Sequence, residues 1–462
     1  MISFETMGNA VCLLIEDGTP LIVTDPWLVG TAYFGSWAQD RPLSQNQIAS
    51  CVAAPYAWFS HGHPDHMHME SIALLSRDTT ILLGDHYSTE IRDVFVAEGF
   101  RDVRVCPDKQ WLHLSDTVRV MSISNINQDT ILVVEAGDTI IINQNDSPFF
   151  GEDPFFRGLV RQYKTSYLLA LCAIDADMLN FVDEAGNSMA GPPDARKKGA
   201  IWNVSQRCDY LGVKNFCCSS SQHVYVRADS VWANPYRIGW SDMQQHWISR
   251  SAKLIEPYVA VELDSGRITR NHPSQQTDFS QVSDTTADDD WAEAMTPQDW
   301  SALNAFVSKF ETLQSKIDFL EFVVAGESRR FFLTPGARTK SPARQRGIVF
   351  QVPRRSLMDT VKYGFFDDLL IGNFMKTRLV NTTMYPYFSP RIAKYGGNAK
   401  VYTQTELARF YWHYFKRSPV AMARFVAQNR WEYNILPRIK FVLAKIGLFQ
   451  MVKQIYRRRH TL

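Results

Sequence analysis

Four side chains that commonly bind metals fall within six residues of one another near the start of the chain. They are His61, His63, Asp65 and His66, in the order His-Gly-His-Pro-Asp-His, directly after an apolar run. In an extended segment, residues two apart point the same way, so His61 and His63 can reach one metal ion. Pro64 keeps His63 extended and favours a turn, which directs Asp65 and His66 toward a second ion. The segment predicts a two-metal site, because a chance cluster would leave four polar groups without partners.

Short apolar strands separated by turns are expected to position this cluster. Strands are predicted over residues 11–15, 21–24, 56–60, 80–83, 118–123, 131–135, 139–142 and 215–218, with a helix around 68–76. Asp17-Gly18 and Gly137-Asp138 are turn signals between two pairs of these strands. Strands and helices alternate, which indicates an α/β fold in which polar residues gather where strands end.

The HxHxDH pattern after a strand resembles the signature of the metallo-β-lactamase superfamily. The resemblance covers residues 1–270 and implies a metallo-β-lactamase αββα sandwich, with an enzymatic site at one edge. It also implies three further ligands: one before the second hairpin, a bridging carboxylate after that hairpin, and a later histidine.

Two of these implied ligands have candidates at strand ends. Asp146 stands just past the strand 139–142 and fits the bridging carboxylate, although an Asx turn that ends the hairpin is an alternative interpretation. His223 follows the strand-like segment 215–218 and is preferred as the late histidine over His246 and His272.

The ligand before the hairpin departs from the superfamily pattern, because residues 122–130 contain no histidine. Asp129 is the expected substitute, in preference to Asn125, Asn127 and His113. A carboxylate there gives harder ligands, so the expected cofactors are two divalent transition-metal ions, either zinc or iron or manganese.

Asp25 ends the second predicted strand, in the sequence Thr-Asp-Pro-Trp. It matches a superfamily position that orients a metal-binding histidine. A turn opened by Asp-Pro is the alternative.

Three functions follow from this ligand set. The first is hydrolysis of an ester, amide or phosphoester by a metal-activated hydroxide, with Asp65 as the catalytic residue that steers the proton of the nucleophile. In this scheme one metal is held by His61, His63, Asp129 and Asp146, and the other by Asp65, His66, His223 and Asp146. The second is dioxygen activation by two irons in the same cage. The third is a recognition or assembly protein with a vestigial metal site, against which the intact HxHxDH pattern argues.

A weaker resemblance to the CMP-sialic acid hydroxylase branch favours the oxygenase alternative. It rests on Asp-Thr before the hairpin, Asn-Asp after it, and the Ser-Ser-Gln-His segment. Those hydroxylases carry a Rieske iron–sulfur module, and this chain shows no pair of Cys-x-His and Cys-x-x-His motifs. An oxygenase would therefore need a separate electron donor.

Beyond the first domain the sequence changes character. Residues 271–290 are rich in Ser, Thr, Gln and Asp and predict a polar linker. Residues 291–462 are expected to be mainly helical, with Thr403 and Glu406 forming a capping box ahead of a helix over 407–415.

A basic amphipathic helix is expected at the end of the chain. No acidic residue follows Glu432, while apolar residues from Ile439 to Tyr456 recur at helical spacing. Such a helix can contact an anionic membrane surface, a protein partner or its own domain.

Composition restricts the partners. Among 462 residues, 49 Lys and Arg balance 48 Asp and Glu, so no overall field favours nucleic acid, and a small-molecule substrate is expected. Seven cysteines, two of them adjacent, suit reduced thiols. The sequence shows no signal peptide or apolar span, so a cytoplasmic location is expected, with peripheral membrane association as an alternative.

Overall fold

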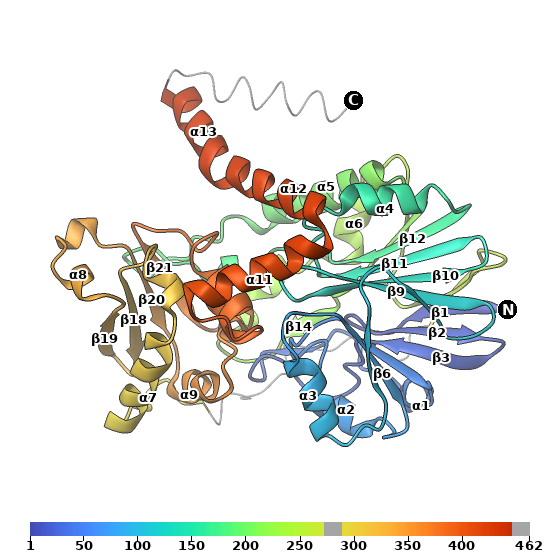
Figure 1. Cartoon of the computed structure of the whole chain (residues 1–462), viewed down its shortest axis with the longest axis horizontal. Helices are drawn as coiled ribbons and strands as arrows, with labels where there is room; N and C mark the ends of the chain where they lie inside the picture. Colours follow the sequence, from blue (N-terminus) through green and yellow to red (C-terminus); the bar gives the residue numbers. More distant parts are fainter. Residues whose placement is uncertain (272–288, 446–462) are drawn as a thin grey trace.

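Two β-sheets packed face to face form the first part of the chain, in a computed structural model that describes residues 1–271 and 289–445 (Figure 1). The first sheet has eight strands in the order β17-β16-β1-β2-β3-β5-β6-β7. In that order the strands are Ile268–Arg270, Val259–Glu262, Ile2–Thr6, Cys12–Glu16, Thr19–Thr24, Tyr56–Phe59, Thr80–Gly84 and Val103–Cys106.

The second sheet has seven strands in the order β15-β13-β12-β11-β10-β9-β8. These are Lys253–Ile255, Asn215–Cys218, Thr165–Ala170, Thr139–Asn145, Thr130–Ala136, Val118–Ser124 and Trp111–His113. Strands β10 and β11 are almost wholly buried, which explains why they appear in the sequence as continuous apolar runs rather than as an alternating pattern. A separate two-stranded ribbon joins β4 (Trp37–Gln39) to β14 (His223–Tyr225).

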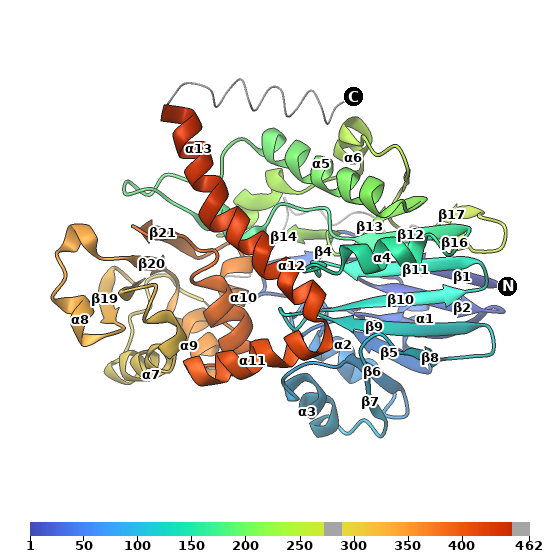
Figure 2. The same ribbon diagram turned by 45° about the horizontal axis from the view of Figure 1, so that its top comes forward.

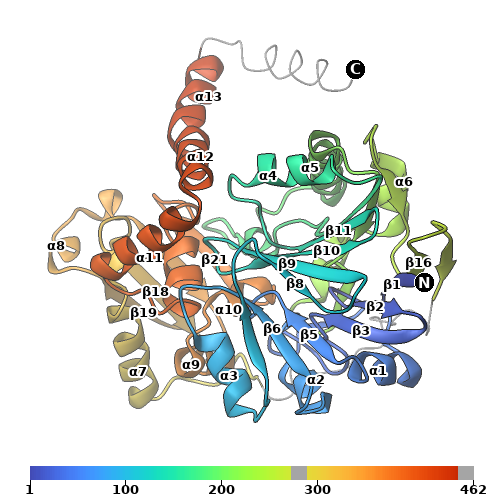
Figure 3. The same cartoon turned by 45° about the vertical axis from the view of Figure 1, so that its right-hand side comes forward.

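Helices cover the outer face of each sheet and complete four layers (Figure 3). Helices α1 (Gln45–Val52), α2 (Met69–Leu74) and α3 (Glu90–Ala97) pack on the first sheet. Helices α4 (Asp153–Val160), α5 (Pro193–Leu211) and α6 (Trp240–His246) pack on the second. Between the sheets lies a core that includes Trp58, Leu132 and Leu169. The layers are those of the expected αββα sandwich.

One edge of the sandwich collects the polar residues. Strands β3, β5, β6 and β7 run parallel in one sheet, as do β11, β12, β13 and β15 in the other. The carboxyl ends of neighbouring parallel strands meet at the same edge, where open α/β sheets place their ligand sites. The segments that start at Asp25, Ser60, Asp146 and Ser219 therefore all begin at this edge.

The C-terminal region contains a second unit with a sheet of its own (Figure 1). Its strand order is β19-β18-β20-β21, at Glu327–Phe332, Phe319–Val324, Gly347–Gln351 and Lys376–Val380. Its helices are α7 (Pro297–Ser308), α8 (Pro335–Arg338), α9 (Arg354–Tyr363), α10 (Asp367–Ile371), α11 (Gln404–Arg417), α12 (Pro419–Arg430) and α13 (Leu436–Lys445). The region is helical as expected, but the sheet was not predicted.

Short 3₁₀ and π segments complete the described chain. The 3₁₀ helices are η1 (Ala176–Asn180), η2 (Val231–Tyr236), η3 (Glu311–Leu313) and η4 (Pro342–Arg344). The π-helical segments are η5 (Pro390–Gly397) and η6 (Trp431–Ile435), the second of which joins α12 to α13.

Buried contacts join the two units. Arg227 is almost fully buried, and its Nη2 donates to Asp289 Oδ2 at 2.8 Å while its Nη1 donates to Ser356 Oγ at 3.2 Å. Its guanidinium also lies 3.9 Å from the centre of the Phe374 ring. A further core packs Ile126 of the first unit against α11 and α12. The C-terminal region therefore forms part of one packed body with the sandwich.

Most predicted elements lie where the sequence indicated. The capping box is present, since Glu406 N donates to Thr403 Oγ1 at 3.2 Å and Thr403 N donates to Glu406 Oε2 at 3.0 Å. The predicted linker falls mostly outside the described residues, as does the end of the basic helix after residue 445. Over the described chain, no helix combines the length and apolar character needed to cross a membrane.

Candidate metal centre

The loop after β5 carries the histidine cluster. Strand β5 is a buried parallel strand between β3 and β6, so the loop begins at the polar edge of the sandwich. The amides of His66 and Met67 donate to the carbonyl of His63 at 3.0 and 2.8 Å, which closes the turn predicted after Pro64. This turn brings His66 back toward His61, with ring centres 4.2 Å apart.

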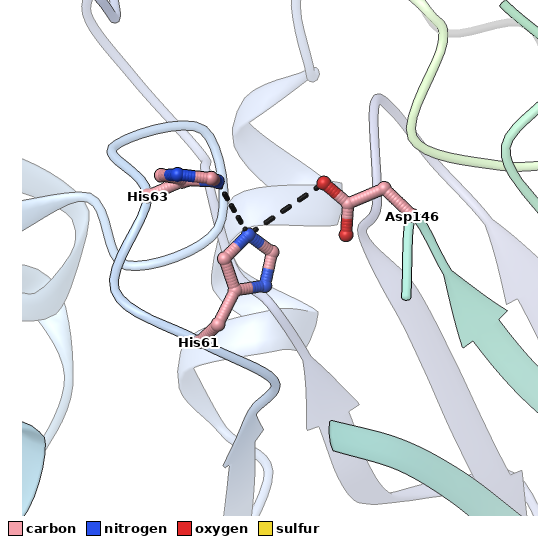
Figure 4. Close-up of side chains that lie close together, drawn as sticks. All are labelled: His61, His63 and Asp146. Atoms are coloured by element: carbon pink, nitrogen blue, oxygen red, sulfur yellow. Dashed lines mark hydrogen bonds and ion pairs between the residues drawn. The ribbon is translucent and has the colours of Figure 1, made fainter. Parts of the chain in front are cut away.

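The first donor group consists of His61, His63 and Asp146 (Figure 4). The Nε2 atom of His61 lies 2.8 Å from Nδ1 of His63 and 3.6 Å from Oδ2 of Asp146. These atoms come from two loops of different sheets and face a common point. Two imidazole nitrogens and one carboxylate in this arrangement are suited to a divalent metal ion.

A second donor group lies on the other side of Asp146. The Nε2 atom of His66 is 3.4 Å from Asp65 Oδ2 and 3.7 Å from Asp146 Oδ2. This Nε2 atom is buried and makes no hydrogen bond with any described residue, and the same is true of Asp146 Oδ1. One carboxylate oxygen of Asp146 thus faces His61 on one side and His66 on the other.

Asp25, the residue predicted to orient a metal-binding histidine, contacts His66. Its Oδ2 is 3.0 Å from Nδ1 of His66, and its Oδ1 accepts a hydrogen bond from the amide of Ser60 at 2.7 Å. Asp25 is fully buried and has a φ of 43°, a left-handed conformation that few residues other than glycine adopt. The contact leaves Nε2 of His66 directed at the donor group.

Asp65 is held by two donors that the sequence did not reveal. Its Oδ2 accepts a hydrogen bond from Asn9 Nδ2 at 2.7 Å, and its Oδ1 accepts one from the hydroxyl of Tyr33 at 2.5 Å. Burial opposes ionisation of Asp65, but the charge of His66, together with the hydrogen bond from Tyr33, outweighs it and lowers the pKa of the carboxyl. Asp65 is thus placed as a carboxylate.

Asp129 lies in the turn between β9 and β10, on the wall of the same cavity. Its side chain is 8% exposed, and its amide donates to Asn125 Oδ1 at 3.4 Å. Burial raises the pKa of Asp129 to about 6, with Lys394 opposing the shift and Asp146 adding to it. It stands outside the compact group formed by His61, His63 and Asp146.

His223 begins β14 and lies on the cavity wall with Asp65 and Asp146. Its ring stacks on Trp37 at 3.4 Å with a 4° interplanar angle, and its buried Nδ1 has no hydrogen-bond partner among the described residues. Burial lowers the pKa of His223 to about 3, so the ring is a neutral imidazole with a free nitrogen lone pair.

The C-terminal region supplies the residue that contacts the far side of His63. Asp367 Oδ2 on α10 lies 2.9 Å from His63 Nε2, and both side chains are largely buried. Burial opposes protonation of His63, but the hydrogen bond and charge of Asp367 raise its pKa to about 10. Sequence reasoning missed Asp367, although an acidic pair inside the apolar run 365–371 is an unusual pattern that could have indicated it.

His68 and His86 lie outside the compact group of His61, His63 and Asp146. His68 caps α2 by accepting from the amide of Ser71, and His86 Nε2 lies 3.0 Å from Thr130 Oγ1. His246 ends α6, and His272 lies outside the described residues.

The donor set fits a pair of metal ions. Nitrogen and carboxylate oxygen atoms converge from both sheets, and His66 Nε2, His223 Nδ1 and Asp146 Oδ1 are buried without hydrogen-bond partners among the described residues. Buried polar atoms left in this state are costly, and a divalent cation would satisfy them. The mixed nitrogen and oxygen ligands are compatible with zinc, iron or manganese.

A cavity of about 960 Å³ opens in front of the donor groups. Its wall on the sandwich side includes His63, Asp65, Asp129 and His223. The C-terminal region contributes Lys394 and several tyrosines, among others. A space of this size can hold a small-molecule substrate.

The strand order, the four layers and the position of HxHxDH at the sheet edge are those of a metallo-β-lactamase fold, and the histidine and aspartate side chains at that edge could hold a metal ion. No family model matches the chain. Over 146 residues, 29% of this chain, it is 27% identical to cytidine monophosphate-N-acetylneuraminic acid hydroxylase of Mus musculus. The match covers 25% of the length of that protein.

Two solved structures share part of this architecture. The isothiocyanate hydrolase from Delia radicum gut bacteria is 15% identical, with 58% of this chain and 99% of that chain covered and a TM-score of 0.37. CmlA, a diiron beta-hydroxylase from Streptomyces venezuelae, is 14% identical, with 58% and 54% covered and a TM-score of 0.35. Both TM-scores are low, so the fold is identified from the strand order and the four layers of the sandwich.

Proposed function

We propose that the chain is a dinuclear metal-dependent hydrolase that cleaves an ester, amide or phosphoester bond of a small molecule. The observation that carries the proposal is the position of Asp146. Its Oδ2 lies 3.6 Å from His61 Nε2 and 3.7 Å from His66 Nε2, so one carboxylate serves both donor groups. This is the arrangement required of a bridging ligand.

The proposed ligands follow from the two groups. His61, His63 and Asp146 would hold the first ion, with Asp129 as its further ligand. Asp65, His66, His223 and Asp146 would hold the second. When bound, two divalent transition metals acidify a coordinated water and polarise the oxygen of the scissile bond.

The chain's own side chains then position the reactants. Asp65, fixed by Asn9 and Tyr33, is an ionised acceptor that can take and orient the proton of the attacking water. Lys394 projects from η5 into the cavity and is the strongest charge partner of Asp129. Its ammonium group is placed to attract an anionic part of the substrate.

Asp129 favours a second candidate, a diiron oxygenase. A carboxylate in place of the usual histidine makes the ligands harder and more anionic, which suits iron. The partial identity with a hydroxylase is in line with this alternative. Such a reaction would need electrons from a separate donor protein.

Reconstitution of the metal-free chain separates the candidates. Zinc-loaded and iron-loaded protein are assayed against nitrophenyl esters and bis(nitrophenyl) phosphate, and for dioxygen consumption with a chemical reductant. The hydrolase proposal predicts turnover by the zinc form, abolished by Asp146→Asn. The control Asp138→Asn alters an exposed carboxylate at the opposite end of the same strand and should keep activity. Dioxygen consumption by the iron form, with no hydrolysis by either form, would establish the oxygenase instead.

A further inference from the structure

The helices at the end of the described chain expose an apolar surface of unusual extent. Nine large apolar side chains on α11, α12, η6 and α13 are at least 39% exposed: Trp412, Phe415, Val420, Val426, Trp431, Ile435, Ile439, Phe441 and Val442. Figure 2 shows α12, η6 and α13 as one long helical rod whose far end stands clear of the sandwich. Contiguous exposure of this kind in a soluble protein marks a contact surface.

Five of the seven exposed large apolar residues of the rod form a strip. Val420, Trp431, Ile435, Ile439 and Val442 follow one another at intervals of 11, 4, 4 and 3 residues. This spacing places them along one side of a helix. Tryptophan and branched aliphatic side chains in one strip are typical of a helix that lies at the surface of a bilayer.

The charge of the same helices indicates the partner. Residues 404–445 contain eight Lys and Arg but only two Glu, although the whole chain has a net charge of only +1. Arg438, Lys440 and Lys445 are exposed on α13. The sequence continues beyond residue 445 with further basic residues and no acidic one. A basic surface of this kind repels a second copy of itself and attracts anionic lipid headgroups.

The surface also adjoins the entrance to the metal centre. A groove of about 800 Å³ between α11, α12 and η6 is lined mainly by apolar side chains, among them Trp412, Phe415 and Met422. Six residues line both this groove and the cavity of the metal centre: Pro386, Tyr411, Phe425, Asn429, Tyr433 and Asn434. A partner on this face would therefore lie next to the mouth of the cavity.

We propose that α11, α12, η6 and α13 dock the protein on an anionic membrane surface, with the strip 420–442 inserted at the headgroup level and the basic residues on the lipid phosphates. Docking brings the groove to the bilayer, so a substrate with an apolar chain can pass from the membrane toward the metal centre. The surface contact does not depend on the reaction, so it can fail or succeed independently of the proposed hydrolase.

Vesicle co-sedimentation of the full chain tests this inference. The wild type should bind vesicles of phosphatidylcholine and phosphatidylglycerol in equal amounts, and should bind phosphatidylcholine alone at least tenfold more weakly. Trp431→Glu with Ile435→Glu should reduce binding at least tenfold. The matched control Val96→Glu with Met189→Glu alters two apolar residues elsewhere that are at least as exposed, and it should bind like the wild type.

A second pair of variants tests the charges. Arg438→Gln with Lys440→Gln should weaken binding about tenfold or more, because each basic residue near an anionic surface contributes severalfold. Arg101→Gln with Lys164→Gln is the control, which removes two exposed charges elsewhere on the chain. Circular dichroism and metal content should be unchanged in all four variants. Absence of binding by the wild type, equal binding to both vesicle types, or a solution dimer abolished by Trp431→Glu would overturn the inference.

Discussion

Replacement of Asp367 by asparagine tests whether the C-terminal region shapes the metal centre. Asp367 Oδ2 accepts a hydrogen bond from Nε2 of His63 at 2.9 Å, and this contact leaves Nδ1 of His63 facing His61. The aspartate can only accept, so when His63 is neutral it keeps the proton on Nε2 and leaves the lone pair on Nδ1. An asparagine can instead donate, which would stabilise the tautomer whose proton blocks the metal.

The expected loss is 10- to 100-fold in metal affinity, the range found when an outer carboxylate of a ligating histidine is removed. This corresponds to about 1.4 to 2.7 kcal/mol. The contact is short and both side chains are largely shielded, with 13% and 7% of their surfaces exposed, so solvent does little to replace it. Titration of the metal-free protein in competition with a chromogenic chelator measures the affinity directly.

A matched variant separates this effect from simple destabilisation. Asp318 is a buried aspartate in the same region, paired with Lys340 and Arg346 away from the cavity. Asp318→Asn should lower the unfolding temperature but leave metal affinity within a factor of two or so of the wild type. If Asp367→Asn binds metal as tightly as the wild type, or if Asp318→Asn loses affinity equally, Asp367 does not position His63.

Three further outcomes are expected. Removing a proposed ligand by His63→Ala should reduce the bound metal from about two ions per chain to less than one by elemental analysis; unchanged content would remove His63 from the site. Asp129→His should raise zinc retention relative to iron in competitive loading, and an unchanged preference would show that Asp129 is not a ligand. Burial and the neighbouring Asp175 raise the pKa of Asp177 from 3.8 to about 6. The folded chain therefore holds this proton more tightly than the unfolded chain. As a result, the free energy of unfolding falls as the pH rises from 3.8 to about 6. Asp177→Asn should therefore stabilise the protein at pH 8 by up to about 3 kcal/mol and by almost nothing at pH 3, measured by urea unfolding; an equal effect at both pH values would contradict the shift.

The sequence was most informative where function and local structure coincide. The apolar run over 56–60 predicted a buried strand, and the polar residues after it predicted a site at the sheet edge. Asp25 and Asp146 were proposed from the resemblance to the metallo-β-lactamase superfamily, and each follows the end of a predicted strand. Parallel strands bring their carboxyl ends together whatever the length of chain between them.

Contacts between distant segments left no such local signal. His63 and Asp367 are 304 positions apart, and their contact depends on how the C-terminal region packs against the sandwich. Tyr33 reaches Asp65 from a loop in which it has a φ of 51°, a conformation that propensity does not predict for tyrosine. Asn9 similarly approaches Asp65 across the edge of the sheet.

The C-terminal sheet was not predicted, although the sequence contains local signals for it. Ala325 and Gly326 both have positive φ and join β18 to β19, the geometry of a tight hairpin turn. The β18 segment Phe-Leu-Glu-Phe-Val-Val also favours a strand. The strong helical pattern from residue 403 onward dominated the prediction for the whole region, because its capping box is a more specific signal than a short strand.

Two histidines at the site are each oriented by a carboxylate, and the two carboxylates come from different parts of the chain. Asp25 orients His66 from within the sandwich, whereas Asp367 orients His63 from the C-terminal region. The two proposed metal positions therefore depend on different parts of the fold. Any movement of α10 relative to the sandwich would act on the His63 side directly, and on the His66 side only through the shared Asp146. The C-terminal region that carries α10 also lines the cavity and carries the proposed membrane-docking helices. Its packing against the sandwich can therefore couple three properties: metal occupancy at the first position, substrate access and contact with the membrane surface.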